Sequence, residues 1–405
     1  MPLTDEAGQL DRRVVISALG IAQILAWGTS FYFPAVFATA IVADTGWSLS
    51  WVVSGTSIGL LVAGLISPQV GRIIDRHGGR PVMLASSLFF AAGLAGAGLA
   101  SNLPLYLSAW ALIGIGMGTG LYDAVFAALG RLYGSGARGP ITNLTLFGGF
   151  ASTICWPLSA FMIDHVGWRI ACLIYAGLHL VVALPLQMAV MRQAPSRVAP
   201  NKAQDNLGQP AVPSRIENET LIFVLLAVML SISAGIGSIV IVNFMIFLQA
   251  RGVDYAVAVS LGTLFGPAQV GARVVERLFG NRYHPIWTMV ASCSLMAIGL
   301  IMLLGSFPLL LLIILIYGAG YGISWIGRGT LPLALFGPER FPRLMGKLAF
   351  PSLIVQAAAP SAGAWLIEAS GAHVTIAVLT ALALINVVLI GLLWASCRAR
   401  ILTDT

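Results

Sequence analysis

The sequence carries little charge. Only 9% of its 405 residues are charged, whereas soluble globular proteins carry about 25%. Hydrophobic residues make up 58% and the mean hydropathy is +0.91, so the composition excludes a soluble globular protein and indicates a polytopic membrane protein. The net charge of +7 does not indicate binding to nucleic acid, because the basic residues lie between apolar runs and form no separate basic domain.

Motifs for metal, nucleotide and covalent chemistry are also missing. The four cysteines show no metal-ligand or disulfide spacing. No GxxxxGK[ST] motif is present, which argues against an ATP-driven pump. The glycines of GIGMGTG at 114–120 lie inside an apolar run with no preceding strand, which favours close helix packing over a nucleotide loop. The sequence has no HExxH, nucleophile elbow or paired carboxylates, so we expect no enzyme activity, no cofactor and no metal.

Long apolar runs dominate the sequence instead. A transmembrane helix needs about 20 predominantly apolar residues, and we count twelve segments that fit. The predicted spans are 14–42, 49–70, 82–100, 104–130, 141–163, 169–191, 221–249, 255–272, 285–305, 308–335, 348–367 and 373–396. We therefore predict an all-α membrane protein.

The longest break between spans is Arg192–Thr220. It holds several prolines and charges and few large apolar residues, a composition typical of a flexible linker that cannot bury a core. It divides the chain into an N-terminal six-helix bundle, 1–191, a linker, 192–220, and a C-terminal six-helix bundle, 221–405.

The basic residues are distributed asymmetrically over this topology. Of the 22 Lys and Arg, all but Arg169, Arg251 and Arg328 fall on the side of the termini and the linker. Positively charged loops face the cytoplasm, so we expect both termini to be cytoplasmic. We place the protein in the cytoplasmic (inner) membrane of a bacterium.

The two halves repeat each other. The GxGxG pattern at Gly114 recurs at Gly318, an offset of 204, and Pro157 recurs as Pro360, an offset of 203. Two parallel six-span halves related by an axis along the membrane normal are a known transporter arrangement.

A charged segment, GRIIDRHGGRP at 71–81, lies between the second and third spans, and we interpret it as a short loop. A degenerate copy lies near position 271. The segment resembles the signature G-x-x-x-D-R-x-G-R-R of the major facilitator superfamily. The matching residues are Gly71, Asp75, Arg76, Gly79 and Arg80, echoed by Glu276, Arg277 and Arg282. The resemblance implies the fold of that family, with twelve transmembrane helices in two pseudo-symmetric bundles.

The same resemblance implies a role for these residues as a conformational latch. In that family the aspartate packs at the cytoplasmic end of a neighbouring helix and the arginines form charge pairs that hold the outward-open state. Carboxylates favour helix N-termini and cations favour C-termini. The alternative is that the charges only enforce topology.

A finer resemblance concerns residues 26–52, AWGTSFYFPAVFATAIVADTGWSLSWV, which are similar to the monocarboxylate and oxalate–formate antiporter branch. Members of that branch usually carry a cation within the eighth span. Here Gly266 stands at that position, and Arg273 follows about two turns deeper toward the cytoplasm. Some bacterial relatives of this general type export metalloids or organoarsenicals, and this alternative stays open.

Two charges lie within apolar spans: Asp123 in the fourth and Arg328 in the tenth. A charge there costs about 2.5–3.5 kcal/mol on insertion scales and is a functional candidate by default. The repeat places Asp123 opposite Gly327, so the two charges lie at nearly equal depth. We hypothesise that Arg328 holds an anionic or polar substrate group and that Asp123 is its counter-ion or the proton-coupling carboxylate. The alternative is a structural ion pair between the halves.

Further substrate candidates are side chains with a polar tip on spans that, by the resemblance, line or flank the cavity. They are Trp27, Tyr32, Tyr122, Trp325, Asn243 and Gln356. Each could equally serve in helix packing or as an interfacial anchor.

We therefore expect a secondary active transporter for a small organic solute, an organic anion such as a monocarboxylate, driven by protons or by exchange. The alternatives are efflux of a metalloid or a hydrophobic drug-like compound and, in another class, a non-transporting receptor or assembly factor. The expected partners are a small-molecule substrate, protons and the lipid bilayer, with no nucleic acid, and the chain is expected to be a monomer.

Overall fold

A computed structural model describes residues 11–191, 218–305 and 307–401. The predicted linker 192–220 lies outside the described residues except for its last three. Within the described ranges the chain is helical and contains no strand. In chain order the elements are α1 (Arg12–Gly28), α2 (Pro34–Thr45), α3 (Leu49–His77), α4 (Arg80–Gly98), α5 (Leu103–Gly120), α6 (Tyr122–Tyr133), η1 (Gly134–Ala137), α7 (Arg138–Gly149), α8 (Ala151–Leu178), η2 (His179–Ala183), α9 (Leu184–Val190), α10 (Glu219–Gln249), α11 (Tyr255–Gly262), α12 (Phe265–Phe279), η3 (Gly280–Arg282), α13 (Pro285–Leu304), α14 (Leu310–Phe336) and α15 (Phe341–Ile401).

These elements make twelve crossings. Helix α8 contains a sharp break at Gly167 (φ 78°), and α15 contains one at Gly371 (φ 83°). Glycine alone adopts such φ values without strain, so each of these helices is two spans joined at one residue. Seven described helical stretches are long and apolar enough to cross a membrane, and two of them hold three and two consecutive spans that run together without a gap. The first and eighth spans are each divided into two shorter helices, α1 with α2 and α11 with α12. Divided at the two glycines and at the loops, the described chain has the predicted number of spans.

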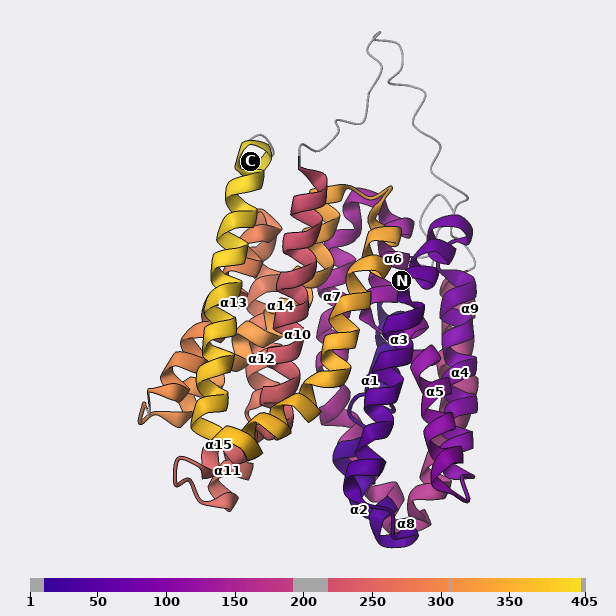
Figure 1. The fold of residues 1–405 in the computed structure, drawn as a ribbon. Helices are drawn as coiled ribbons and strands as arrows, with labels where there is room; N and C mark the ends of the chain where they lie inside the picture. Colours follow the sequence, from indigo (N-terminus) through magenta and orange to yellow (C-terminus); the bar gives the residue numbers. More distant parts are fainter. Residues whose placement is uncertain (1–10, 192–217, 306, 402–405) are drawn as a thin grey trace.

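The helices form two bundles, shown in indigo to magenta and in rose to yellow in Figure 1. Helices α1 to α9 share one large apolar core, to which a few residues of α14 and α15 contribute across the seam, and α10 to α15 contain two smaller ones. We call these groups the N-terminal and C-terminal bundles. The terminal side is the side where α1 begins and α15 ends, and the opposite side is where α8 turns at Gly167.

Glycines at equivalent positions show the internal repeat. A Cβ on Gly118 would lie 3.0 Å from the Cα of Ala63 in α3, and one on its counterpart Gly322 would lie 2.7 Å from the Cα of Gln269 in α12. The fourth span thus packs backbone to backbone on the second, as the tenth packs on the eighth. The predicted pseudo-symmetry of the two bundles is confirmed.

The interpretation of 71–81 as a loop was wrong. Helix α3 continues to His77 and α4 begins at Arg80, so only Gly78 and Gly79 connect them. Gly78 has φ 80°, a left-handed value that reverses the chain in one step. Apolarity marks only the part of a helix that meets lipid, and charged residues can continue that helix into water.

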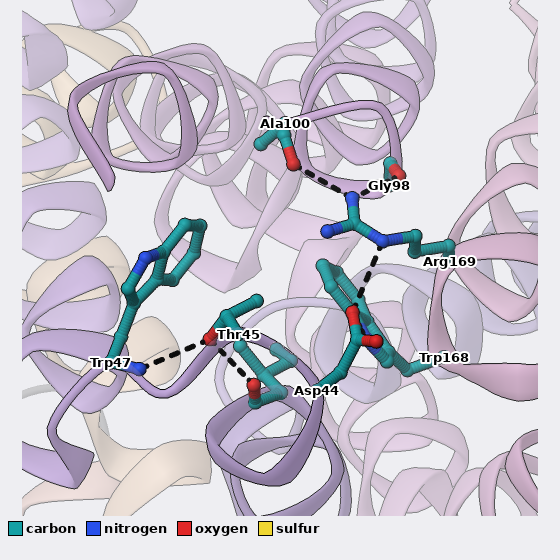
Figure 2. Close-up of polar contacts among 8 residues, drawn as sticks. Asp44, Thr45, Trp47, Gly98, Ala100, Trp168 and Arg169 are labelled. Atoms are coloured by element: carbon teal, nitrogen blue, oxygen red, sulfur yellow. Dashed lines mark hydrogen bonds and ion pairs between the residues drawn. The ribbon is translucent and has the colours of Figure 1, made fainter. Parts of the chain in front are cut away.

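Polar contacts brace the N-terminal bundle on the opposite side (Figure 2). Arg169, just past the break in α8, donates from Nη1 to the carbonyls of Gly98 (3.2 Å) and Ala100 (2.7 Å). Its Nε lies 3.2 Å from Oδ2 of Asp44, which also accepts from Nε1 of Trp168 at 3.1 Å. The first, third and sixth spans are therefore tied together at one point.

The two bundles meet along a seam on the terminal side and diverge toward the opposite side in Figure 1. Ser67 of α3 donates to the Gly346 carbonyl of α15 at 3.0 Å. A Cβ on Gly71 would lie 2.6 Å from the Pro342 carbonyl oxygen. On the other flank of the seam, α7 packs against α12 and α14.

Candidate functional site

The site begins at a break in the fourth span. Helix α5 ends at Gly120, where a Cβ would lie 1.8 Å from Ser86 Oγ, and Leu121 is extended (ψ −177°). Helix α6 then starts at Tyr122, which places Asp123 in its first turn. A helix N-terminus favours a carboxylate there. The break lies inside an apolar run, so hydropathy did not reveal it.

Arg328 of α14 reaches across the seam to Asp123. Its Nε lies 2.7 Å from Oδ1 and its Nη2 lies 2.9 Å from Oδ2, a bidentate ion pair between the bundles. The remaining nitrogen, Nη1, donates to Ser352 Oγ at 3.1 Å. The side chains of Arg328 and Asp123 are 6% and 16% exposed, so the ion pair is largely withdrawn from water.

Four aromatic rings gather beside this ion pair. The ring centroid of Trp27 lies 4.9 Å from that of Tyr122 and 5.3 Å from that of Trp325, and Tyr122 and Trp325 are 5.5 Å apart. Tyr32 adjoins Trp27 at 6.2 Å. The Trp325 ring also lies 5.5 Å from the Arg328 guanidinium carbon, within the range of a cation–π contact.

A small cavity of about 20 Å³ opens among these side chains. Its lining combines four aromatic rings, three leucines, one carboxylate and one amide: Trp27, Phe31, Tyr122, Trp325, Leu60, Leu121, Leu353, Asp123 and Gln356. These residues come from the first, second, fourth, tenth and eleventh spans. The cavity is therefore shared by both bundles, and its walls are mostly apolar, with the carboxylate of Asp123 and the amide of Gln356 as polar groups.

Six of the eight predicted substrate candidates lie in or directly beside this cavity, and Tyr32 joins them through the ring of Trp27. Asn243 is not brought there. It is buried in α10, where Nδ2 donates to the Ile239 carbonyl at 3.0 Å. The functional roles of all eight stay predictions.

One polar residue at the site was missed. Gln23 of α1 donates from Nε2 to the carbonyl of Gly120 at 2.5 Å and accepts from Nε1 of Trp27 at 3.2 Å. It thus supplies a partner for a carbonyl at the break in the fourth span and orients a cavity ring. A glutamine in the first apolar run was the available signal, because an uncharged polar side chain at that depth needs a partner.

Two of the first set of predicted latch residues, Gly71 and Asp75, contact the C-terminal bundle at the seam. Asp75 Oδ2 is 2.5 Å from Nε of Arg343, in the first turn of α15. Gly71 contacts the backbone of α15, and a Cβ on Gly79 would lie 2.4 Å from that of Ala128. Arg76 and Arg80 are exposed.

The repeated copy makes different contacts. Arg277 donates from Nε to Oδ1 of Asn143 in α7, so it does cross the seam. Glu276 accepts from the hydroxyls of Tyr283 and Thr288 within its own bundle. Burial, together with the Glu276 carboxylate, raises the pKa of Tyr283 to about 12. Arg282 is exposed and lies 5.4 Å from the Phe279 ring centroid.

A second cation of the central region, Arg273, was counted as a terminal-side charge rather than a site residue. The eighth span was predicted to end at 272, but α12 runs to Phe279. Arg273 is consequently inside the helix, is 3% exposed, and contacts both bundles. An arginine directly after a predicted span end was the signal that could have revealed it.

The known sequences that resemble this chain are those of transporters. A family model described as Major Facilitator Superfamily matches residues 19–285, more than half of the chain. Monocarboxylate transporter 3 of Rattus norvegicus is 27% identical over 360 residues, covering 83% of this chain and 71% of that protein. The niacin transporter NiaP of Acinetobacter baylyi is 31% identical over 142 residues, covering 34% of this chain and 31% of NiaP.

Solved structures share the architecture. The human organic anion transporter MFSD10 (TETRAN) superposes with a TM-score of 0.71 at 15% identity, covering 94% of this chain and all of that one. The proton:xylose symporter XylE gives 0.69 at 14% identity, covering 93% and 94%. Likeness at these identities shows the fold alone. The family match and the twelve-span fold together show that this chain belongs to the Major Facilitator Superfamily and is a multi-pass membrane transporter of that family.

Proposed function

We propose that this protein moves a small organic anion, such as a monocarboxylate, by alternating access, coupled to protons or to exchange. The observation that carries the proposal is the buried bidentate pair between Asp123 and Arg328, which joins the two bundles beside an aromatic cavity.

An anion that enters this cavity competes with Asp123. Carboxylates bind arginine through two parallel hydrogen bonds, and Asp123 occupies Nε and Nη2 of Arg328 while Ser352 occupies Nη1. A solute carboxylate therefore takes the place of Asp123 rather than adding to it. The contact between the bundles changes when the solute binds.

This competition couples the solute to a proton. Breaking a buried ion pair by removing one partner costs about 3–5 kcal/mol, because the other charge is left uncompensated. Protonation of Asp123 removes that charge. The empty site, with its ion pair, and the site loaded with one anion and one proton then carry the same net charge. Replacement of one bound anion by another also preserves the charge, which is the basis for exchange.

The aromatic walls suit the apolar part of such a solute. Trp27, Tyr122 and Trp325 present ring faces and edges within van der Waals reach of the cavity, and aromatic side chains combine apolar contact with polar tips. The names of several relatives, the monocarboxylate and niacin transporters, support an organic anion.

The arrangement of the bundles supports alternating access. Contacts between the bundles lie along the seam on the terminal side, and rigid-body rocking of one bundle against the other would open this side and close the opposite one. The excess of basic residues on the terminal side favours a cytoplasmic location for it. The conformation described is then outward-facing. We propose a monomer in the inner membrane of a bacterium, with both termini cytoplasmic.

Uptake into liposomes tests the proposal. Purified protein is reconstituted, and uptake of labelled lactate, benzoate, nicotinate and an organoarsenical is measured with and without an inward proton gradient. We expect uptake of at least one carboxylate and its loss in Arg328→Gln. The matched control is Arg340→Gln, which removes an exposed pair with Glu219 inside the C-terminal bundle. Uptake of the arsenical alone, or undiminished carboxylate uptake by folded Arg328→Gln protein, would contradict the proposal.

A further inference from the structure

Arg273 is buried at the seam, where its guanidinium bonds to both bundles. Within its own bundle, Nε donates to the Gly322 carbonyl at 3.0 Å and Nη2 to Oε1 of Gln269 at 3.4 Å. Across the seam, Nη1 donates to the Thr145 carbonyl of α7 at 2.7 Å, the shortest of the three. The side chain thus joins the fifth span to the eighth.

All of these acceptors are neutral. The ion pairs found among the described residues do not include Arg273. The nearest acidic residue along the helix, Glu276, is instead bonded by Thr288 at 2.7 Å and by Tyr283. Buried charges in proteins are normally paired with an opposite charge. A cation held only by carbonyl and amide oxygens retains a strong preference for an anion.

Opening of the terminal side must break the contact with Thr145. Helices α7 and α12 belong to different bundles, so their separation removes the Thr145 oxygen while Gly322 and Gln269 remain with Arg273. The space beside the guanidinium is already close-fitting, since a Cβ on Gly149 would lie 2.8 Å from Nη1. After separation Nη1 faces the opened path between the bundles.

We propose that Arg273 is a second anion-binding residue, whose Nη1 bonds to the Thr145 carbonyl while the terminal side is closed and to the solute's carboxylate once it opens. This inference rests on the proposed function. An anion leaving Arg328 toward the terminal side then meets a second cation before it reaches water. Arg328 then binds the anion while the site is open to the opposite side, and Arg273 binds it while the path is open to the terminal side.

The test compares the two sides of the membrane. The KM for the transported carboxylate is measured separately from the terminal side and from the opposite side, in vesicles of defined orientation. Arg273→Gln and Gly149→Ala both lose the contact with Thr145, but only Gly149→Ala keeps the cation. We therefore expect the terminal-side KM of Arg273→Gln to be about tenfold higher than that of Gly149→Ala, the equivalent of one charge-assisted hydrogen bond, while the opposite-side KM differs less than about twofold between the two variants. Arg340→Gln, which removes an exposed charge of the same bundle, is the matched control and leaves both unchanged. Equal changes on both sides, or no change, would overturn the inference.

A second measurement does not depend on solute. Ile141 is fully buried and packs against Gly329 across the seam, so Ile141→Cys, with the four native cysteines replaced by alanine, reports opening through maleimide labelling. Gly149→Ala keeps Arg273 but pushes it from Thr145, and we expect about tenfold faster labelling. Gly271→Ala, with nothing within 4 Å, should label as the parent does. Unchanged labelling in Gly149→Ala would refute the contact with Thr145. If the wild type moves no organic acid, the proposed function fails and the anion-binding role of Arg273 fails with it.

Discussion

Tyr122 and Arg273 donate to the same oxygen, the carbonyl of Thr145, over distances of 3.3 Å and 2.7 Å. Tyr122 belongs to the wall of the central cavity and Arg273 to the seam. One backbone oxygen of α7 therefore connects the place where a solute would bind with the place where the bundles must separate. Displacement of either donor changes the environment of the other.

Asp123→Asn should separate anion binding from proton coupling. The amide leaves the shape of the cavity unchanged but carries no negative charge. Arg328 is therefore free to bind the solute's carboxylate at any pH. We expect exchange of carboxylate across the membrane to persist and proton-driven accumulation to fall by at least about tenfold. Parallel counterflow and net-uptake assays on the same liposomes measure both. Equal loss of the two activities in folded protein would argue for a purely structural pair.

Gly71→Ala should loosen the seam. The added Cβ would lie 2.6 Å from the Pro342 carbonyl oxygen, and overpacking of this kind costs about 1–3 kcal/mol. We expect faster labelling of Ile141→Cys and a lower transport rate.

Gly271→Ala is the matched control for this substitution, because Gly271 is the counterpart of Gly71 in the repeat and has nothing within 4 Å of its added Cβ. Equal behaviour of the two variants would show that close contact at Gly71 does not hold the seam.

The ion pair between Asp75 and Arg343 should contribute less to closure of the terminal side than the close packing at Gly71 does. The Arg343 side chain is 54% exposed, and exposed pairs contribute about 0.2–1 kcal/mol. Arg343→Asp places two carboxylates together and should accelerate labelling of Ile141→Cys severalfold. The exchanged pair, Asp75→Arg with Arg343→Asp, should restore the original rate. Failure of the exchange to restore it would assign the two charges to membrane topology alone.

Arg169→Ala should lower stability without changing affinity. The substitution removes hydrogen bonds to the Gly98 and Ala100 carbonyls and the half-exposed pair with Asp44, at about 1 kcal/mol per bond. All these partners lie within the N-terminal bundle, far from Arg328. We expect a melting temperature lower by a few degrees and an unchanged KM. A changed KM at equal stability would place this cluster in the transport cycle.

Hydropathy and the repeat predicted much of this molecule. Apolar length determines the number of spans, and the near-constant offset between halves placed Asp123 and Arg328 at the same depth. The structure turns that placement into a bidentate contact. Trp27, Tyr122 and Trp325 could be selected because they are polar-tipped aromatic side chains on spans that, by the resemblance, line the cavity.

The helix breaks and their consequences were not predictable in the same way. The fourth span ends its first helix at Gly120, where Ser86 of another span leaves no room for a side chain, and no local pattern contains that contact. Burial of Arg273 depends on carbonyls from two other helices, which a composition-based span boundary cannot include. Asn243 has the residue type of a site residue, but its helix turns it toward its own backbone.

Proton uptake on solute binding tests the central claim most directly. Isothermal titration of the transported carboxylate into purified protein, in buffers of different ionisation enthalpy, gives the number of protons taken up per bound anion. Competition between the solute and Asp123 for Arg328 predicts uptake of close to one proton by the wild type and none by Asp123→Asn. Equal proton uptake by the two proteins, or none by either, would contradict it.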